Sequence, residues 1–316
     1  MMNASVVSAV TFSAAAGGRE EAAAPRHLPV MAQEIGEGLV LRPGGVFVDA
    51  TVNGGGHAAR FLKVLPADNA YLGLDLDAGA LERAGRRLGE FNSRVVLTRS
   101  SFARLAEAVG PFAGRVTNVL FDLGLSSDQL ADGSRGFSFK VSGSLNMRFD
   151  ADEDSLTAAA VVNTFAEDEL ADVIYEFGEE RRSRAIARAI VARRADRSFD
   201  DAADLAEVVA RAVRGRHGRI HPATRTFQAL RIFVNDELGA LARALPQAAD
   251  VLASGGRLFV ISYHSLEDRI VKRFYREAGE RGELRILTRK PLRPGAEEVR
   301  ANPRSRSARL RIAEKV

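Results

Sequence analysis

The sequence predicts a doubly wound α/β fold that is interrupted by an inserted all-helical domain. Three observations predict it: β-branched runs alternate with helical patterns between residues 46 and 123, helical patterns alone occupy residues 155–215, and strand character returns at residues 256–262. Strands that alternate with helices at this spacing build a parallel sheet from βαβ units. At 316 residues the chain has material for two domains, since domains usually span about 100–200 residues.

The first half is predicted to contain four strands, each a short β-branched or aromatic run. The first three are followed by segments with the period of a helix. The predicted strands are residues 46–50, 70–76, 94–98 and 116–123, and the predicted helices are residues 57–65, 77–91 and 101–109. Open parallel sheets bind ligands outside the carboxyl ends of their strands, so we expect the functional residues there.

The second half is predicted to be helical before it returns to the sheet. Glycine commonly follows the last residue of a helix, so Gly178 and Gly215 predict two helix ends. A long helix is predicted to open at Pro222 and run through residues 226–245. The predicted domains are a disordered extension at residues 1–24, a discontinuous α/β domain at 25–133 and 220–316, and an inserted helical domain at 134–219.

The basic charge is concentrated in two segments. Residues 181–219 hold eleven arginines and five acids, and residues 269–316 hold fifteen Lys or Arg and six Glu, in a chain whose net charge is +4. Arginine suits phosphate because its forked donors match the phosphate oxygens. The clustering favours a phosphate-bearing partner and makes the helical insert a candidate recognition domain for RNA or another substrate. Genome composition and a solvated helix face explain the arginine bias itself equally well.

The composition also excludes several kinds of site. The chain has no cysteine, which excludes disulfides, thiolate zinc sites and cysteine nucleophiles and indicates a reducing compartment. No run approaches the roughly 20 apolar residues that a membrane helix needs. Glu20 and Glu21 disfavour a transit peptide at the N-terminus. We therefore expect a cytoplasmic protein with no metal and no membrane association.

A glycine-rich turn follows the first predicted strand, in the stretch VDATVNGGGHAARF. Gly54, Gly56 and Ala59 fit the pattern G-x-G-x-x-G/A, and Asp75 follows Gly56 by 19 residues. An acid at this distance reaches ribose hydroxyls in dinucleotide-binding proteins. Sites for S-adenosylmethionine use the same two features, a glycine-rich turn and an acid at the end of the second strand. The turn alone therefore fits an NAD-dependent dehydrogenase, a methyltransferase or a purely structural connection.

Longer blocks distinguish between these readings. They are HLPVMAQE at His27, FDLGLSSDQL at Phe121, RGFSF at Arg135, LNMRFD at Leu145, GEERRSRAIARAI at Gly178, HPATRTFQALRIFVNDEL at His221 and GGRLFVISYHSLEDRIVKRF at Gly255. Together they resemble the bacterial 16S ribosomal RNA cytosine-N4 methyltransferase family, from about His27 to the C-terminus. The resemblance implies a Rossmann-like class I methyltransferase sheet, S-adenosyl-L-methionine as cofactor, and methylation of the N4 of a cytidine in the decoding region of 16S rRNA. It implies the small ribosomal subunit as partner, and the sequence allows a homodimer.

The resemblance also implies which residues form the site. The residues that match the family's cofactor contacts are Gly55, Gly56, His57, Asp75, Phe102, Asp122 and Gln129. The candidate catalytic residues are Asp122, Tyr263 and His264. Asp122 would accept hydrogen bonds from the reacting amine or would bind only the cofactor. Tyr263 and His264 would contact the target base, or would form only a polar strand end.

Two positions depart from the family's pattern. Asn53 stands where relatives commonly have glycine, but asparagine tolerates left-handed backbone, so we expect the turn to be kept. Asn146 stands where many relatives have aspartate, so a catalytic role of that acid would not transfer. Two alternatives to the methyltransferase remain at this point: an NAD-dependent dehydrogenase and a non-catalytic RNA-binding assembly factor.

Overall fold

The computed structural model describes residues 29–140, 142–150, 155–213 and 221–316, and the chain divides into two compact units. An α/β unit is formed by the residues up to Gly124 together with Leu238–Val316, and a helical unit is formed by Leu125–Glu237. The predicted extension at residues 1–24 and the predicted helix end at Gly215 lie outside the described residues. None of the described helices is both long enough and apolar enough to cross a membrane.

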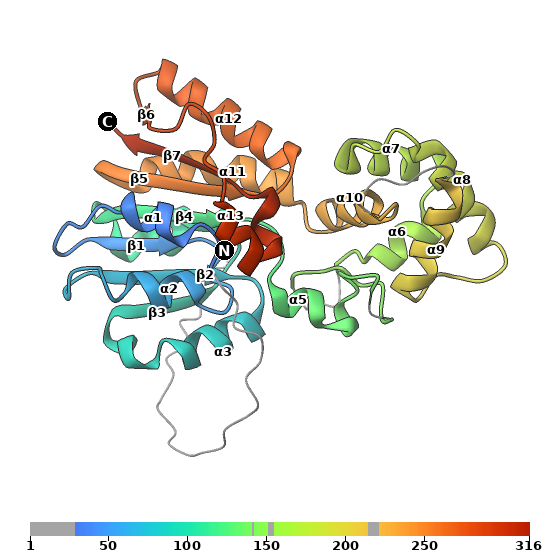
Figure 1. The fold of residues 1–316 in the computed structure, drawn as a ribbon, viewed down its shortest axis with the longest axis horizontal. Coiled ribbons are helices and arrows are strands. Elements are labelled where there is room, and N and C mark those ends of the chain that lie inside the picture. The colour runs from blue at the N-terminus through green and yellow to red at the C-terminus, as the bar shows by residue number, and fades with distance from the viewer. Residues whose placement is uncertain (1–28, 141, 151–154, 214–220) are drawn as a thin grey trace, which may run out of the picture. The chain divides into compact units, whose positions relative to one another are not determined.

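The α/β unit contains one sheet, in which the described strands follow the order β3-β2-β1-β4-β5-β7-β6 (Figure 1). Strands β1 to β5 are parallel, and β7 runs antiparallel between β5 and β6. The strands are β1 (Val46–Asp49), β2 (Ala70–Asp75), β3 (Val95–Arg99), β4 (Val116–Asp122), β5 (Leu252–Ser262), β6 (Leu284–Ile286) and β7 (Arg309–Lys315). The C-terminal segment thus completes the sheet, as predicted. From β1 the strands continue to β2 and β3 on one side, and from β4 they continue to β5 on the other side. The strand order therefore reverses between β1 and β4, and the carboxyl ends of these two strands form the topological switch point.

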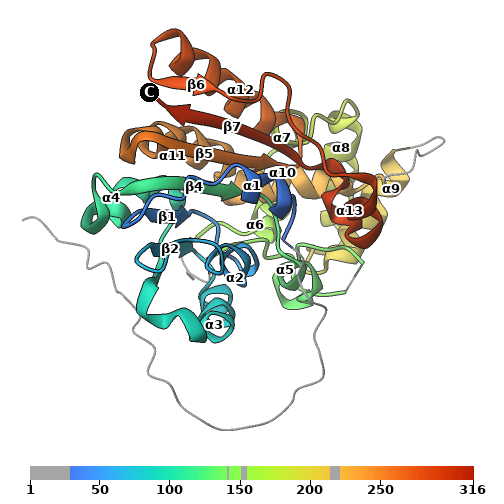
Figure 2. The same ribbon diagram turned by 60° about the vertical axis from the view of Figure 1, so that its left-hand side comes forward.

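Helices cover both faces of this sheet. Residues of α4, α11 and α12 share one hydrophobic core with Val48 and Val119, and residues of α1, α2 and α3 share another with Phe47 and Leu120. Alternate strand residues therefore face opposite layers, as a doubly wound sheet requires. Figure 2 shows α1 in front of the strands. The helices are α1 (Ala32–Glu37), α2 (Gly56–Phe61), α3 (Ala78–Arg87), α4 (Leu105–Val109), α11 (Glu237–Val251), α12 (Ser265–Glu280) and α13 (Ala296–Ala301).

The helical unit has a core of its own, which includes Ile174, Ile186 and Leu205. Its helices are α5 (Ser127–Ala131), α6 (Ala158–Thr164), α7 (Glu167–Gly178), α8 (Ser183–Arg194), α9 (Ala202–Ala212) and α10 (Thr224–Val234). The unit is longer at both ends than the predicted insert of residues 134–219. The reason is that Leu130 of α5 and Leu230 of α10 pack into this core.

The predicted single helix through residues 226–245 is wrong, because the chain forms two helices there. α10 ends at Val234, and α11 begins at Glu237 after Asp236, whose φ of 47° is left-handed. Between them, the Asn235 side chain donates to the Met147 carbonyl and accepts from the Phe149 amide, both at 2.7 Å. Asparagine that binds backbone groups in this way competes with helix continuation.

The predicted helix end at Gly178 is confirmed, but Gly178 is not the cap residue that was expected there. Gly178 is the last helical residue of α7, and Glu179 takes the left-handed position that follows, with φ 49°. A Cβ on Gly178 would lie 2.6 Å from the carbonyl oxygen of Arg225 in α10. Glycine is needed here for the close approach of two helices and not for a left-handed backbone.

Candidate active site

Four polar side chains stand where parallel strands of the α/β unit end. Asp49 ends β1, Asp75 ends β2, Asp122 ends β4, and Tyr263 follows the last residue of β5. Carboxyl ends of parallel strands meet at one edge of a sheet, so these residues belong to the edge that contains the switch point.

The glycine-rich turn connects β1 to α2 at this edge. Asn53 (φ 49°) and Gly55 (φ 74°) are both left-handed, so the prediction that asparagine keeps the turn is confirmed. Gly55 has a second constraint, because a Cβ there would lie 3.3 Å from Cα of Ala84 in α3. A Cβ on Gly54 would meet nothing nearer than 3.9 Å, so the backbone is open on that side. The backbone of this turn is therefore accessible to a ligand next to the acids that end the parallel strands.

Asp75 is held by backbone amides from both sides. One carboxylate oxygen accepts from the Asn53 amide and the other from the Asp77 amide, each at 2.9 Å. Burial nevertheless raises the pKa of Asp75 to about 6, against the lowering effect of these hydrogen bonds. The side chain remains partly exposed. A carboxylate has about four acceptor positions, so Asp75 keeps capacity for further donors.

Asp122 contacts side chains from two other segments of the α/β unit. Its Oδ1 accepts a hydrogen bond of 2.7 Å from the Tyr263 hydroxyl, and its Oδ2 lies 3.3 Å from Nε2 of His57. The Asp122 amide donates to the Thr51 hydroxyl at 2.7 Å. The Tyr263 ring reaches this position across Gly124, whose added Cβ would lie 3.3 Å from it. The structure therefore brings His57, Asp122 and Tyr263 together, from three segments of the chain.

The other predicted site residues have different surroundings. Phe102 is partly buried, and its ring contacts Phe121 edge-on at 5.7 Å between centroids. His264 is the N-cap residue of α12, where its Nδ1 accepts from the Glu267 amide. Gln129 belongs to the helical unit, where its side-chain oxygen accepts from the Ser126 amide in a capping box.

Sequence reasoning missed two acids of this site. Asp49 is buried and accepts from the Tyr71 hydroxyl at 2.7 Å, and burial raises its pKa. It ends a predicted strand, as Asp75 and Asp122 do, so the same rule could have found it. Glu298 in α13 accepts from the Met31 amide at 2.8 Å. No sequence signal connects Glu298 to the edge, because only the fold brings α13 back beside α1.

Comparisons with known proteins identify the family. A model of the MraW methylase family matches residues 24–316. The chain belongs to this family. It is 44% identical over 309 residues to ribosomal RNA small subunit methyltransferase H of Heliobacterium modesticaldum, covering 92% of this chain and 98% of the relative. It is 46% identical over 315 residues to the protein of the same name from Thermomicrobium roseum, covering 94% and 96%.

A solved structure with a similar fold is an rRNA methylase from Streptococcus thermophilus, with 13% identity, a TM-score of 0.42, and coverage of 90% of this chain and 93% of that one. This likeness is too distant to inform on the site. Family membership confirms the predicted class I methyltransferase fold, the methyltransferase activity and the cofactor S-adenosylmethionine. It does not favour an NAD-dependent dehydrogenase or a non-catalytic assembly factor.

The residues at the carboxyl edge of the sheet have groups that suit the binding of S-adenosylmethionine. Asp75 has acceptor capacity for ribose hydroxyls, and the partly exposed Phe102 ring offers an aromatic face. Both ring nitrogens of the buried His57 make no hydrogen bond with a described residue. The open side of Gly54 leaves room for a ligand to approach the backbone.

Proposed function

We propose that this protein methylates the exocyclic N4 of a cytidine in the decoding region of 16S rRNA, with the small ribosomal subunit as its substrate. The observation that supports this most is the 44–46% identity to proteins named ribosomal RNA small subunit methyltransferase H, over more than nine tenths of both chains. The choice of cytidine N4 comes from the family resemblance of the motif blocks. Such a substrate assigns the protein to the cytoplasm.

The cofactor site in this proposal is built around the glycine turn. S-adenosylmethionine supplies, when bound, a methyl group activated by its sulfonium. Asp75 accepts the ribose hydroxyls, Phe102 covers the adenine, and the bare backbone at Gly55 and Gly56 admits the methionine portion. The remaining cofactor contacts that we propose are His57, Asp122 and Gln129.

The catalytic edge in this proposal is Asp122 with Tyr263 and His264. The lone pair of a cytosine amine is delocalised into the ring, so the enzyme must orient the amine and accept its hydrogen bonds as the nitrogen becomes pyramidal. The Tyr263 hydroxyl holds the Asp122 carboxylate, and the Thr51 hydroxyl holds the Asp122 backbone amide, so the carboxylate is preorganised for this task. The buried Nε2 of His264 lies 3.1 Å from Oε1 of Glu267, and His264 is our candidate contact to the base.

The proposal is tested on rRNA from a deletion strain. Mass spectrometry of digested 16S rRNA should find N4-methylated cytidine absent from the deletion strain and restored by the gene in trans. Purified protein should then transfer labelled methyl to small subunits from the deletion strain. Unchanged N4-methylated cytidine in the deletion strain, or labelling of another nucleotide, would contradict the proposal.

A further inference from the structure

His57 is a buried polar side chain that the described contacts leave without a hydrogen bond. It is 6% exposed, and both ring nitrogens are without a hydrogen-bond partner among the described residues. One face of the ring stacks on Phe61 at 5.5 Å. Nε2 faces Oδ2 of Asp122 at 3.3 Å. Buried polar groups are normally satisfied, so an imidazole left open beside a carboxylate indicates a role in the chemistry of the edge.

The two oxygens of Asp122 are not equivalent. Oδ1 accepts a hydrogen bond from the Tyr263 hydroxyl, so this oxygen is already engaged. Burial, followed by the charge of Asp122, raises the pKa of Tyr263 well above its ordinary value, so the phenol stays protonated. Oδ2 is therefore the oxygen of Asp122 that can accept a proton, and it is the oxygen that lies near His57.

Several acidic residues interact with His57. Asp49 of β1 and Glu298 of α13 interact electrostatically with His57, in addition to Asp122 of β4. Glu34 of α1 acts on Glu298, and its Oε2 is itself buried without a hydrogen bond to the described residues. His57 thus interacts with acids from β1, β4 and α13.

We propose that His57 receives, through Asp122, the proton that the cytidine amine loses on methylation. This inference rests on the proposed function. The N4–carbon bond forms while the carbon–sulfur bond breaks and its electron pair stays on sulfur. N4 then carries one proton too many, which passes to Oδ2 of Asp122 and from there to Nε2 of His57. Asp122 touches the substrate, and His57 is a positioning residue that acts through it.

Two variants test the inference by single-turnover rates at saturating S-adenosylmethionine. His57→Gln keeps a polar side chain of similar reach but cannot take up a proton, so we expect the rate to fall by roughly 10²-fold to 10⁴-fold. His57→Ala should lose as much and regain at least about tenfold when imidazole is added, because the small base can fill the vacated site. Calorimetry measures the affinity of each variant for S-adenosylmethionine, so that its rate is determined at a concentration that saturates that variant and a loss of cofactor binding is kept apart from a loss of chemistry.

A readout without catalysis comes from ¹⁵N-histidine NMR of the full chain. Asp122→Asn should shift the ring nitrogen resonances of His57, assigned by their absence in His57→Gln, and leave those of His221 unchanged. A wild-type rate in His57→Gln, or a folded His57→Ala that imidazole does not restore, would overturn the inference. If the unmodified protein fails to label cytidine N4, the proposed function falls instead, so the two failures are distinguishable.

Discussion

At the scale of single residues, Asp75 is the acid whose role is easiest to isolate. Asp75→Asn keeps the shape of the side chain but removes its charge and one acceptor oxygen. Hydrogen bonds to charged groups are worth about 1.5–3 kcal/mol each, so the affinity for S-adenosylmethionine should fall at least about tenfold by calorimetry. Asp68→Asn, at an exposed acid, is the matched control and should bind normally. Normal binding by a folded Asp75→Asn would remove Asp75 from the cofactor site.

If Asp75 binds the cofactor, we expect the affinity for S-adenosylmethionine to depend on pH. Burial raises the pKa of Asp75 from 3.8 to about 6, so the folded protein keeps this proton over a range in which the unfolded chain has lost it. The contribution of Asp75 to the free energy of unfolding is therefore fully present below the unfolded value and is lost as pH rises through about 6. Ribose hydroxyls need the ionised acceptor, so affinity should instead rise as pH increases through about 6. Titrations at several pH values check this, and Asp75→Asn should lose the rise.

What the sequence could predict about single residues depended on local pattern. Asp75 was predicted from its distance to the glycine-rich turn and Asp122 from the family resemblance, and both end strands at the edge where open parallel sheets bind ligands. The left-handed Asn53 was predicted from the turn chemistry of asparagine. The contact between Tyr263 and Asp122 was not predictable, because it depends on the neighbouring positions of β4 and β5 and on the bare Gly124 between them.

At the scale of elements, the contact between α7 and α10 explains why glycine stands at the end of α7. Gly178→Ala would drive a Cβ to 2.6 Å from the backbone oxygen of Arg225, and backbone cannot move aside cheaply. Overpacking of this kind costs typically 1–3 kcal/mol, so the helical unit should unfold at lower urea. Gly89→Ala is the control, because a Cβ there meets nothing within 4 Å. Equal urea midpoints for the two variants would contradict the close packing.

Strong periodic patterns gave the elements of this fold, and tertiary contacts set their limits. The strands at residues 46–50 and 70–76 were predicted nearly to their observed ends, because each is buried along its length. The break between α10 and α11 was not predictable from periodicity, because it is made by Asn235, which bonds to backbone far away in the sequence. Three-residue β6 has too little pattern to be recognised before its partner β7 is known.

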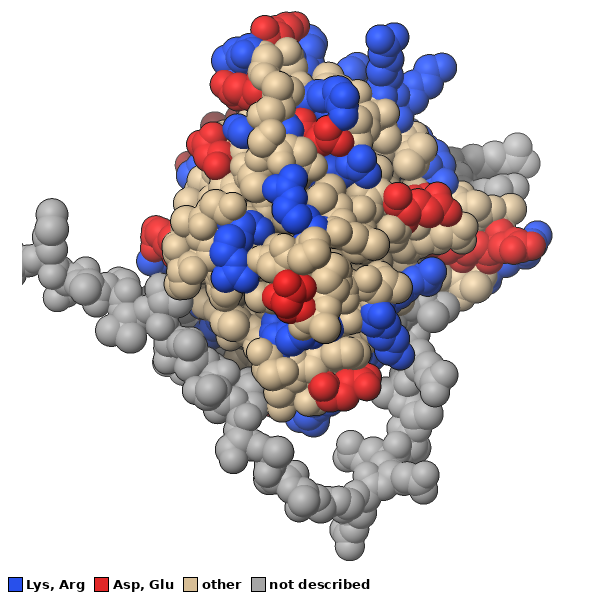
Figure 3. Space-filling model, turned by 90° about the vertical axis from the view of Figure 1, so that its left-hand side faces the viewer, with Lys and Arg blue, Asp and Glu red and all other residues tan. Residues whose placement is uncertain are grey.

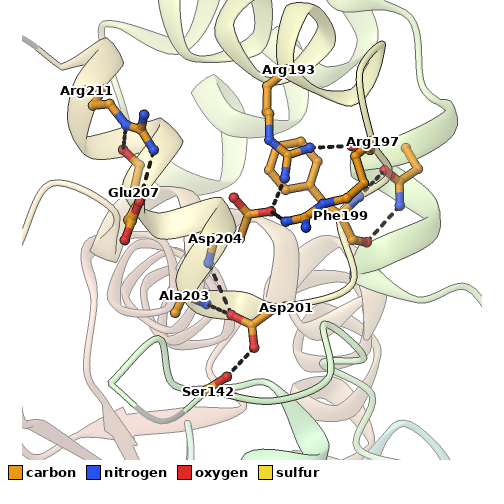
Figure 4. A network of polar contacts seen from close by, with 10 residues as sticks. Ser142, Arg193, Arg197, Phe199, Asp201, Ala203, Asp204, Glu207 and Arg211 are labelled. Atoms are coloured by element: carbon orange, nitrogen blue, oxygen red, sulfur yellow. Dashed lines mark hydrogen bonds and ion pairs between the residues drawn. The ribbon is translucent and has the colours of Figure 1, made fainter.

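At the scale of the whole molecule, the basic segments differ in how their charge is used. In the C-terminal segment, Arg309 and Arg311 both pair with Asp268, and Arg281 pairs with Glu283. On the face shown in Figure 3, acidic and basic side chains are interspersed without a field of one sign. In the helical unit, Asp204 binds both Arg193 and Arg197 (Figure 4). Several arginines are therefore already paired with acids of the protein itself, and fewer remain for a phosphate-bearing partner.

The arginines at the start of α8 are the best candidates for RNA contact, because Arg181 and Arg184 are exposed. If they hold rRNA phosphates, Arg181→Ala/Arg184→Ala should weaken binding to the small subunit. It should also reduce the slope of log affinity against log salt by up to about one per lost contact. Cofactor affinity and melting temperature should stay unchanged. Arg197→Ala, which removes an arginine already paired with Asp204, should leave the slope as it is. An unaltered slope in a folded double variant would make these two arginines a solvated helix face, and the RNA contacts would then have to be sought on other elements.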